Sequence, residues 1–119
     1  MNSQLPSATY AEALEETPML ARERERAAIE RAIELLRRAA TKGRRSREAA
    51  EAIIYVNRLW SILIEDLANP ENDLPTPLRA SLISVGLWAM READLIRLEQ
   101  SENFSGVIEV MRSIGEGLR

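Results

Sequence analysis

Residues 46–68 read SREAAEAIIYVNRLWSILIEDLA, and this stretch decides the fold. Apolar side chains recur in it at alternating steps of four and three residues, at Ala49, Ile53, Val56, Trp60, Leu63 and Leu67. Such a seam is typical of a helix that packs nearly antiparallel to its neighbours. Ile54, Leu59, Ile62 and Ile64 widen the apolar face. We therefore expect a central helix that begins at Ser46, touches two neighbours and ends at Asn69-Pro70.

A second helix is predicted before this one. Thr17-Pro18 has the residue types favoured at the N-cap and first helical position, and Gly43 suits the C-terminal end. Between them, to about Ala40, runs an apolar stripe: Ala28, Ile29, Ala32, Ile33, Leu36 and Ala39. This spacing indicates an amphipathic helix with Arg and Glu on its outer face.

Two more helices are predicted after a proline-rich connector, residues 69–77. Thr76-Pro77 repeats the N-cap signature and starts a third helix that reaches Gln100. Its expected seams are Leu78, Leu82, Val85 and Ala89, and Ile83, Leu87 and Met90, with Trp88 between them. No charge occurs between Arg79 and Arg91, so we expect burial on nearly all sides, by the bundle or by a partner. A fourth helix begins at Asn103 or Ser105.

The fold class that follows is all-α, a single small bundle of four main helices. We assign residues 17–119 to the bundle and residues 1–16 to an N-terminal arm that is helical in part or orders on a partner. The chain of 119 residues is long enough for one domain of this kind.

Composition narrows the function classes. The chain contains neither Cys nor His, which removes thiol nucleophiles, the usual zinc ligands and the commonest general acid or base. No convergent acid, base and nucleophile stands out, so we expect a protein that is not an enzyme and has no metal or cofactor. The acidic residues Glu65, Asp66, Glu71 and Asp73 match no calcium loop.

The cellular location is predicted from the absence of targeting and membrane-spanning segments. The start of the chain has neither a basic region nor an apolar run, so we expect no signal peptide. The longest charge-free stretch is too short for a bilayer of roughly 30 Å, and we expect no membrane insertion. A cytoplasmic location follows.

Charge is distributed unevenly. Residues 22–47 hold ten basic and four acidic residues, although the whole chain carries a formal charge of −3. The basic turn from Arg37 to Arg47 could contact RNA phosphates. No aromatic residue is interleaved with these arginines, so a solvated helix–helix turn is the better interpretation.

Candidate binding residues surround the connector and the two tryptophans. We assign partner contact to Tyr10, Arg58, Leu59, Trp60, Leu74, Arg79 and Trp88. A polar or structural rim is assigned to Asn57, Asn72, Pro75 and Ser81. Aromatic side chains can line a groove that takes a partner helix, although core packing is the more common role of at least one tryptophan.

These residues resemble a known family. Asn57-Arg58-Leu59-Trp60, Leu74-Pro75, residues 78–84, Leu87-Trp88 and the closing Ile114…Gly117-Leu118 are similar to the flagellar biosynthesis regulator FlaF family. Tyr10-Ala11 is similar to its amino-terminal start. The resemblance implies a cytoplasmic role in flagellin production and export, paired with a second regulator, FlbT.

The resemblance further implies that unassembled flagellin is bound directly, as by a chaperone, through amphipathic helical segments of its termini. Two alternatives stay open. The chain could act on flagellin messenger RNA with FlbT, through the basic turn. It could also be an adaptor that covers its apolar third helix with a second copy of itself.

Overall fold

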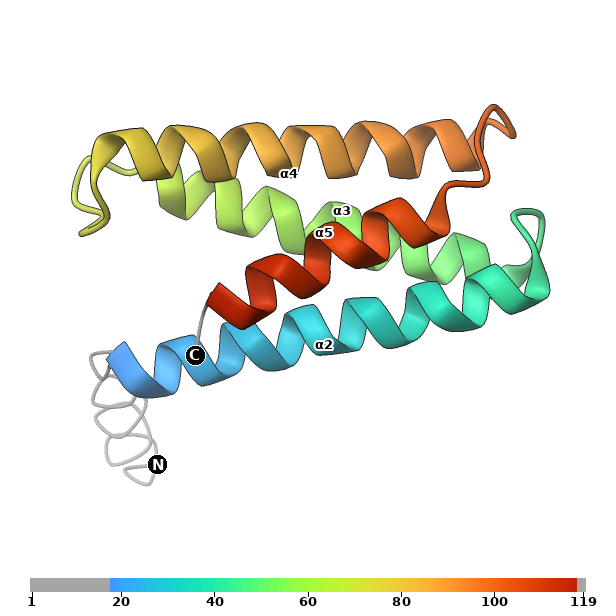
Figure 1. Cartoon of the computed structure of the whole chain (residues 1–119), viewed down its shortest axis with the longest axis horizontal. Coiled ribbons are helices and arrows are strands. Elements are labelled where there is room, and N and C mark those ends of the chain that lie inside the picture. Colours follow the sequence, from blue (N-terminus) through green and yellow to red (C-terminus); the bar gives the residue numbers. More distant parts are fainter. Residues whose placement is uncertain (1–17, 118–119) are drawn as a thin grey trace, which may run out of the picture.

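The structure, a computed structural model, describes residues 18–117, and over this range the chain forms an all-α bundle of four helices. They are α2 (Pro18–Lys42), α3 (Arg47–Ala68), α4 (Thr76–Arg97) and α5 (Phe104–Gly117). In Figure 1, α2, α3 and α4 run back and forth, and α5 lies obliquely between α2 and α4. The arm predicted over residues 1–16 lies outside the described residues.

The end of α2 and the start of α3 lie where the residue types at Gly43 and Ser46 predict them. Gly43 takes a φ of 99°, a left-handed conformation that glycine adopts at low cost, and its N–H donates to Ala39 O at 2.8 Å. The Ser46 hydroxyl then accepts a hydrogen bond from the Ala49 N–H at 3.0 Å. Ser46 is thus the predicted N-cap of α3.

The ends of α4 differ slightly from the prediction. The helix begins at Thr76, with Pro75 rather than Thr76 in the N-cap position, and it ends at Arg97 rather than Gln100. Beyond it, Gln100 N–H donates to Leu95 O and Glu99 N–H donates to Ile96 O, while Glu99 has a φ of 61°. This is a Schellman motif with a glutamate in the place that glycine usually takes.

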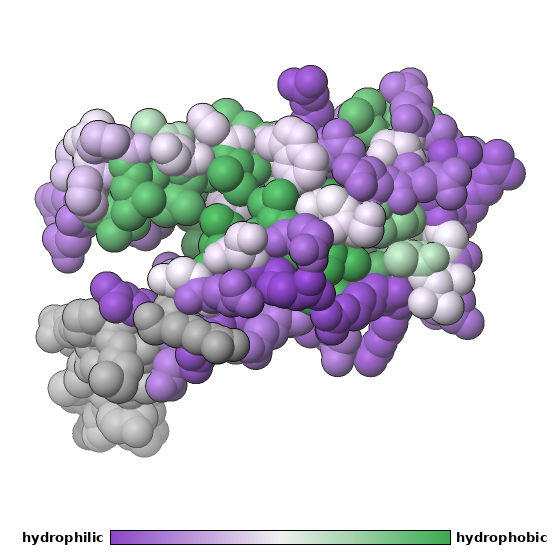
Figure 2. Space-filling model, in the orientation of Figure 1, coloured by the Kyte–Doolittle hydropathy of each residue, from purple (hydrophilic) through white to green (hydrophobic). Residues whose placement is uncertain are grey.

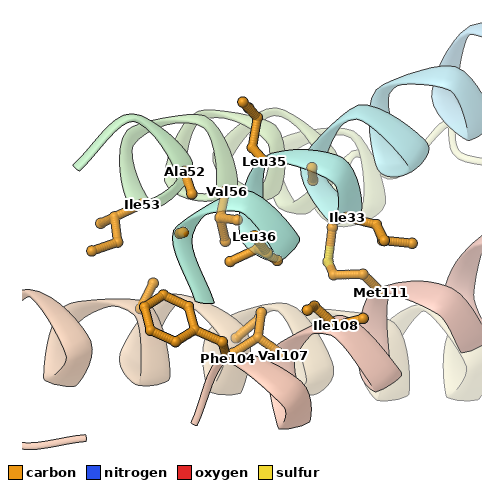
Figure 3. Packing of buried hydrophobic residues seen from close by; sticks show 14 of the residues in the cluster. Ile33, Leu35, Leu36, Ala52, Ile53, Val56, Phe104, Val107, Ile108 and Met111 are labelled. Carbon is orange, nitrogen blue, oxygen red and sulfur yellow. The ribbon is translucent and has the colours of Figure 1, made fainter. Parts of the chain in front are cut away.

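The core lies where α2, α3 and α5 meet (Figure 3). Leu36 of α2, Val56 of α3 and Val107 of α5 are fully buried and point toward one another, beside Phe104. α2 packs along both α3 and α5, and α3 also packs along α4. The seam predicted for α3 is buried as expected, apart from Leu63, which is half-buried.

Trp60 joins three helices. Its side chain is 1% exposed, and its indole Nε1 lies 3.2 Å from Met111 Sδ on α5. Its ring lies against the backbone of α4 at Gly86, where a Cβ would come within 2.8 Å of Cζ3 and closer still to Cε3. Only the absence of a side chain at residue 86 lets α4 approach α3 this closely.

The bundle covers only one face of α4, so of the two predicted covers of this helix only a partner is left for its exposed side. Its buried face runs through small residues and one isoleucine, Gly86, Ala89, Ala93 and Ile96. Leu78, Leu87 and Trp88 are exposed, Leu87 by 56% and Trp88 by 36%. The small residues allow a close backbone approach to α3, which turns the larger apolar side chains outward. Despite this exposed apolar surface, no helix within residues 18–117 has the length and hydropathy to cross a membrane.

We predict that Gly86→Ala lowers the free energy of unfolding by at least about 1 kcal/mol. The added Cβ collides with the Trp60 ring, and this overpacking outweighs the gain of roughly 1 kcal/mol that alanine brings to a helix. Urea unfolding of the two proteins measures the difference.

Gly117→Ala is the control, because a Cβ there meets nothing within 4 Å. Its stability should equal or slightly exceed that of the parent. A Gly86→Ala variant as stable as the parent would contradict the close approach.

Candidate partner-binding groove

The bundle is open at one end because α5 is short. Its 14 residues span roughly 21 Å, whereas the 22 residues of α4 span roughly 33 Å. Among residues 18–117, α2 and α4 do not pack on each other, and α5 is the helix that lies between them, along only part of their length (Figure 1). Figure 2 shows apolar surface over the first half of α4, beside the resulting hollow.

This hollow, which we call the groove, has a volume of about 290 Å³ and is open to solvent. Apolar side chains from all four helices and the connector form most of its wall: Ile29, Trp60, Leu63, Leu67, Leu74, Leu82 and Ile114. The polar side chains that complete it are Arg22, Glu25, Asp66, Asn72 and Asp73. A concave, mostly apolar site with a few polar groups is the usual form of a binding site.

Hydrogen bonds fasten the connector that forms one side of the groove. Arg79 Nη1 donates to the carbonyl oxygens of Leu67 and Asn69, both at 3.2 Å, and its Nε donates to Leu74 O at 3.1 Å. Asn72 Nδ2 donates to Asp66 O at 3.1 Å, and Asn72 Oδ1 accepts from Leu74 N–H at 2.9 Å. These bonds hold Leu74 against the groove.

The structure brings three of the predicted site residues together in the groove: Trp60 at its base, Leu74 on its side and Asn72 beside it. Arg79 does not line the groove, but supports it through the connector. Arg58 is exposed on α3, and Leu59 is buried in the core.

The remaining predicted residues lie elsewhere. Trp88 is exposed on α4 and is not part of the groove wall. Asn57 is half-buried, and Pro75 and Ser81 are exposed. Tyr10 lies outside the described residues. Partner contact by Trp88 or Tyr10 stays a prediction.

Nine of the twelve groove residues were not recognised as site residues from the sequence, among them the acidic residues Glu25 and Asp66. A signal for Glu25 exists, because it precedes Ile29 by four residues and so continues the apolar stripe of α2. Asp66 likewise follows Leu63 by three residues in the half of α3 that lines the groove. In the structure Glu25 is half-buried, whereas Asp66 is exposed in the groove.

Glu25 has a perturbed titration. Partial burial, which disfavours the charged carboxylate, raises its pKa above the ordinary 4.5, and the negative charge of Asp66 raises it further. Arg22 and Arg24 oppose this change without cancelling it. The groove is therefore a place where a carboxylate lacks full compensation.

The basic turn has a structural role at the opposite end of the bundle. Arg45 Nε and Nη2 both lie 2.7 Å from Glu99 Oε1, and Arg44 Nη1 lies 3.7 Å from Glu102 Oε2. Two of the basic residues considered for RNA contact thus pair with the acidic loop between α4 and α5.

We predict that Arg79→Met lowers the free energy of unfolding by about 1–3 kcal/mol, because carbonyl oxygens of the connector lose a charged donor. Urea unfolding measures the stability, and hydrogen exchange of the amides in residues 69–75 should accelerate. Arg58→Met is the matched control, since Arg58 is exposed and bonds to no described residue. If Arg79→Met and Arg58→Met changed the free energy of unfolding by the same small amount, the role of Arg79 in holding the connector would be contradicted.

We predict that Glu25→Gln stabilises the protein at neutral pH. Because its pKa is raised on folding, the folded state binds a proton more tightly than the unfolded chain, and stability falls as pH rises through that window. The neutral amide escapes this loss, so its advantage should be present at pH 7 and fade below the ordinary pKa.

Urea unfolding at several pH values measures the Glu25 effect. Glu23→Gln on the same helix is the control, because Glu23 is exposed and lies outside the groove wall. A Glu25→Gln variant less stable than the parent at neutral pH would contradict the assigned environment.

Comparison with known proteins gives one match. The profile of the family described as flagellar protein FlaF matches residues 6–118, which is nearly the whole chain. No curated protein and no solved structure is significantly similar to the chain. The match covers every element of the bundle and every residue of the groove. The chain therefore belongs to the FlaF family of flagellar proteins, and its role is in flagellum biogenesis.

Proposed function

We propose that this chain is a cytoplasmic, non-enzymatic chaperone that binds unassembled flagellin and so regulates flagellin synthesis or secretion. The observation that carries the proposal is the groove, an apolar hollow left open where α5 stops short of the ends of α2 and α4. Membership of the FlaF family supplies the flagellar context.

The shape of the groove suits side chains of a helix rather than an entire helix. Its volume of about 290 Å³ is at the low end of the range for binding pockets, roughly 300–1,000 Å³. A few apolar side chains on one face of an amphipathic helix can enter such a hollow while the polar face stays in water. Flagellin termini, as the family resemblance describes them, have that character.

The energetics permit a useful affinity. Each apolar side chain that the partner buries contributes roughly 1.5–3 kcal/mol, and ordering a previously disordered segment opposes it. The fixed connector lowers the cost on the side of this protein, because Leu74 is already held in place by Arg79 and Asn72. We therefore expect a reversible complex rather than a permanent one.

We predict a one-to-one complex with monomeric flagellin, with a Kd of about 1 μM or tighter, equal to roughly −8 kcal/mol. Size exclusion with light scattering gives the stoichiometry, and calorimetry on the separated complex gives the Kd. Failure of the full-length proteins to form any complex would contradict the proposed function.

Variants of α4 locate the site. Leu82→Ala should weaken binding by more than about 1 kcal/mol, because Leu82 is in the groove wall. Leu87→Ala is the matched control, since Leu87 is on the same helix but outside the groove, and it should change binding by less than about 0.5 kcal/mol. Trp88→Ala tests the other exposed surface: a loss in that variant with none in Leu82→Ala would move the site out of the groove.

A further inference from the structure

The groove has an excess of negative charge as well as an apolar wall. Three carboxylates, of Glu25, Asp66 and Asp73, share it with one guanidinium, that of Arg22. Glu25 and Asp66 come from different helices, and the negative charge of Asp66 contributes to raising the pKa of Glu25. The apolar wall and the negative charge are features of one site.

Several carboxylates elsewhere on the bundle have cationic partners. Asp94 pairs with Arg97 at 2.7 Å, Glu99 with Arg45, and Glu34 with Arg31. Among residues 18–117, no lysine or arginine lies within ion-pair distance of Glu25 or Asp66, as is also true of exposed carboxylates such as Glu51 and Glu65, but Glu25 is in addition half-buried. Asp66 Oδ2 receives a hydrogen bond from Asn72 Nδ2 at 3.2 Å, which satisfies part of its acceptor capacity but none of its charge.

We infer that the groove takes an amphipathic helical segment of its partner that carries a lysine or arginine among its apolar residues, and that this cation binds between Glu25 and Asp66. The inference rests on the proposed function and adds a basis for selecting one partner segment over others. The apolar wall accepts any apolar stripe of suitable shape, whereas the carboxylate pair selects a stripe with a cation in the correct register.

Charge disfavours the other occupants. Residues 1–17 of the chain contain Glu12, Glu15 and Glu16 and no lysine or arginine, so they offer no cationic side chain to the groove. RNA and anionic lipid are repelled by the same carboxylates. The exposed face of α4 in a second copy is free of charge between Arg79 and Arg91 and offers no cation either.

A second copy of the chain does offer one cation, on the surface formed by the exposed α3 residues Ile54, Arg58 and Ile62. They present an arginine between two apolar side chains, as the inferred occupant does. Docking of this surface into the groove of another copy would join two different patches, and such a contact closes as a ring or continues as an open filament, so it would be seen as self-assembly of the protein alone. The partner segment is therefore the occupant we assign.

A bound cation also removes a cost of the free protein. The mutual repulsion of the two carboxylates and the partial burial of Glu25 are present while the groove is empty. A lysine or arginine that enters the groove compensates both charges and forms charge-assisted hydrogen bonds in a partly dehydrated site. Binding should therefore depend on both carboxylates, weaken with added salt and weaken when Glu25 is protonated.

The test uses the full-length chain and full-length monomeric flagellin, with calorimetry to measure Kd. Combined Glu25→Gln and Asp66→Asn substitution should weaken binding roughly tenfold or more, since the bound cation then lacks both carboxylate partners. Glu23→Gln, with Glu23 exposed and outside the groove wall, is the matched control and should leave Kd unchanged. Circular dichroism confirms that each variant is folded.

A charge exchange identifies the partner cation. Each lysine and arginine in the terminal segments of flagellin is replaced by Glu in turn. One of these flagellin replacements should weaken binding to the parent chain. The same flagellin variant should bind the Glu25→Lys chain more tightly than unaltered flagellin does. Mildly acidic pH provides a second readout: it should weaken binding to the parent more than to Glu25→Gln, with Arg22, Arg24, Asp66 and Asp73 as the charged groups around that position.

The outcomes separate the two proposals. If flagellin binds the parent chain and the doubly substituted chain equally, the cation inference is overturned and the proposed function stands. If flagellin binds neither, the proposed function fails and the inference fails with it. If the protein alone assembles and Arg58→Gln disperses it, a second copy occupies the groove and the inference is overturned.

Discussion

The rest of the structure depends on the contact between the Trp60 indole and the bare backbone of Gly86. The contact lets α4 lie close to α3, and the indole N–H reaches the Met111 sulfur on α5 at 3.2 Å. One side chain therefore sets the spacing of three helices. The small residues Ala89 and Ala93 continue the close approach along α4, which explains why its larger apolar side chains point away from the core.

The groove follows from that arrangement and from helix length. Once α3 holds α4 on one side and α2 on the other, the space between α2 and α4 must be covered by α5, which is too short to cover all of it. The connector closes one side and is kept in shape by Arg79 and Asn72 rather than by a core of its own. The groove is thus built partly from core residues, such as Trp60 and Ile29, and partly from half-buried ones, such as Leu74 and Leu82.

Much of the fold could be predicted from the sequence, because helix ends and heptad-like seams are local signals. Ser46 caps α3 and Gly43 ends α2 as their residue types indicate, and the α3 seam is the central one. The buried face of α4 could not be predicted in the same way. Its sequence between Arg79 and Arg91 has no charged face to mark the outside, and the deciding residues are small rather than apolar and large.

The site was harder to predict than the fold. Trp60, Leu74 and Asn72 were selected and line the groove, yet Trp88 was selected on the same grounds and does not. The reason is that the groove arises from a difference in helix length and from packing between distant segments, neither of which leaves a local pattern. The sequence does show that Glu25 and Asp66 are acidic residues in register with apolar stripes. It does not show that they lie near each other, because that depends on how the helices pack.

The central claim is that flagellin binds in the groove, and residue-resolved NMR tests it most directly. Methyl-labelled protein would be titrated with unlabelled flagellin monomer while the Ile, Leu and Val signals are followed. The predicted result is shifts confined to the groove residues, namely Ile29, Leu63, Leu67, Leu74, Leu82 and Ile114. Shifts at Ile54, Ile62 and Leu87 with the groove signals unchanged would contradict the account.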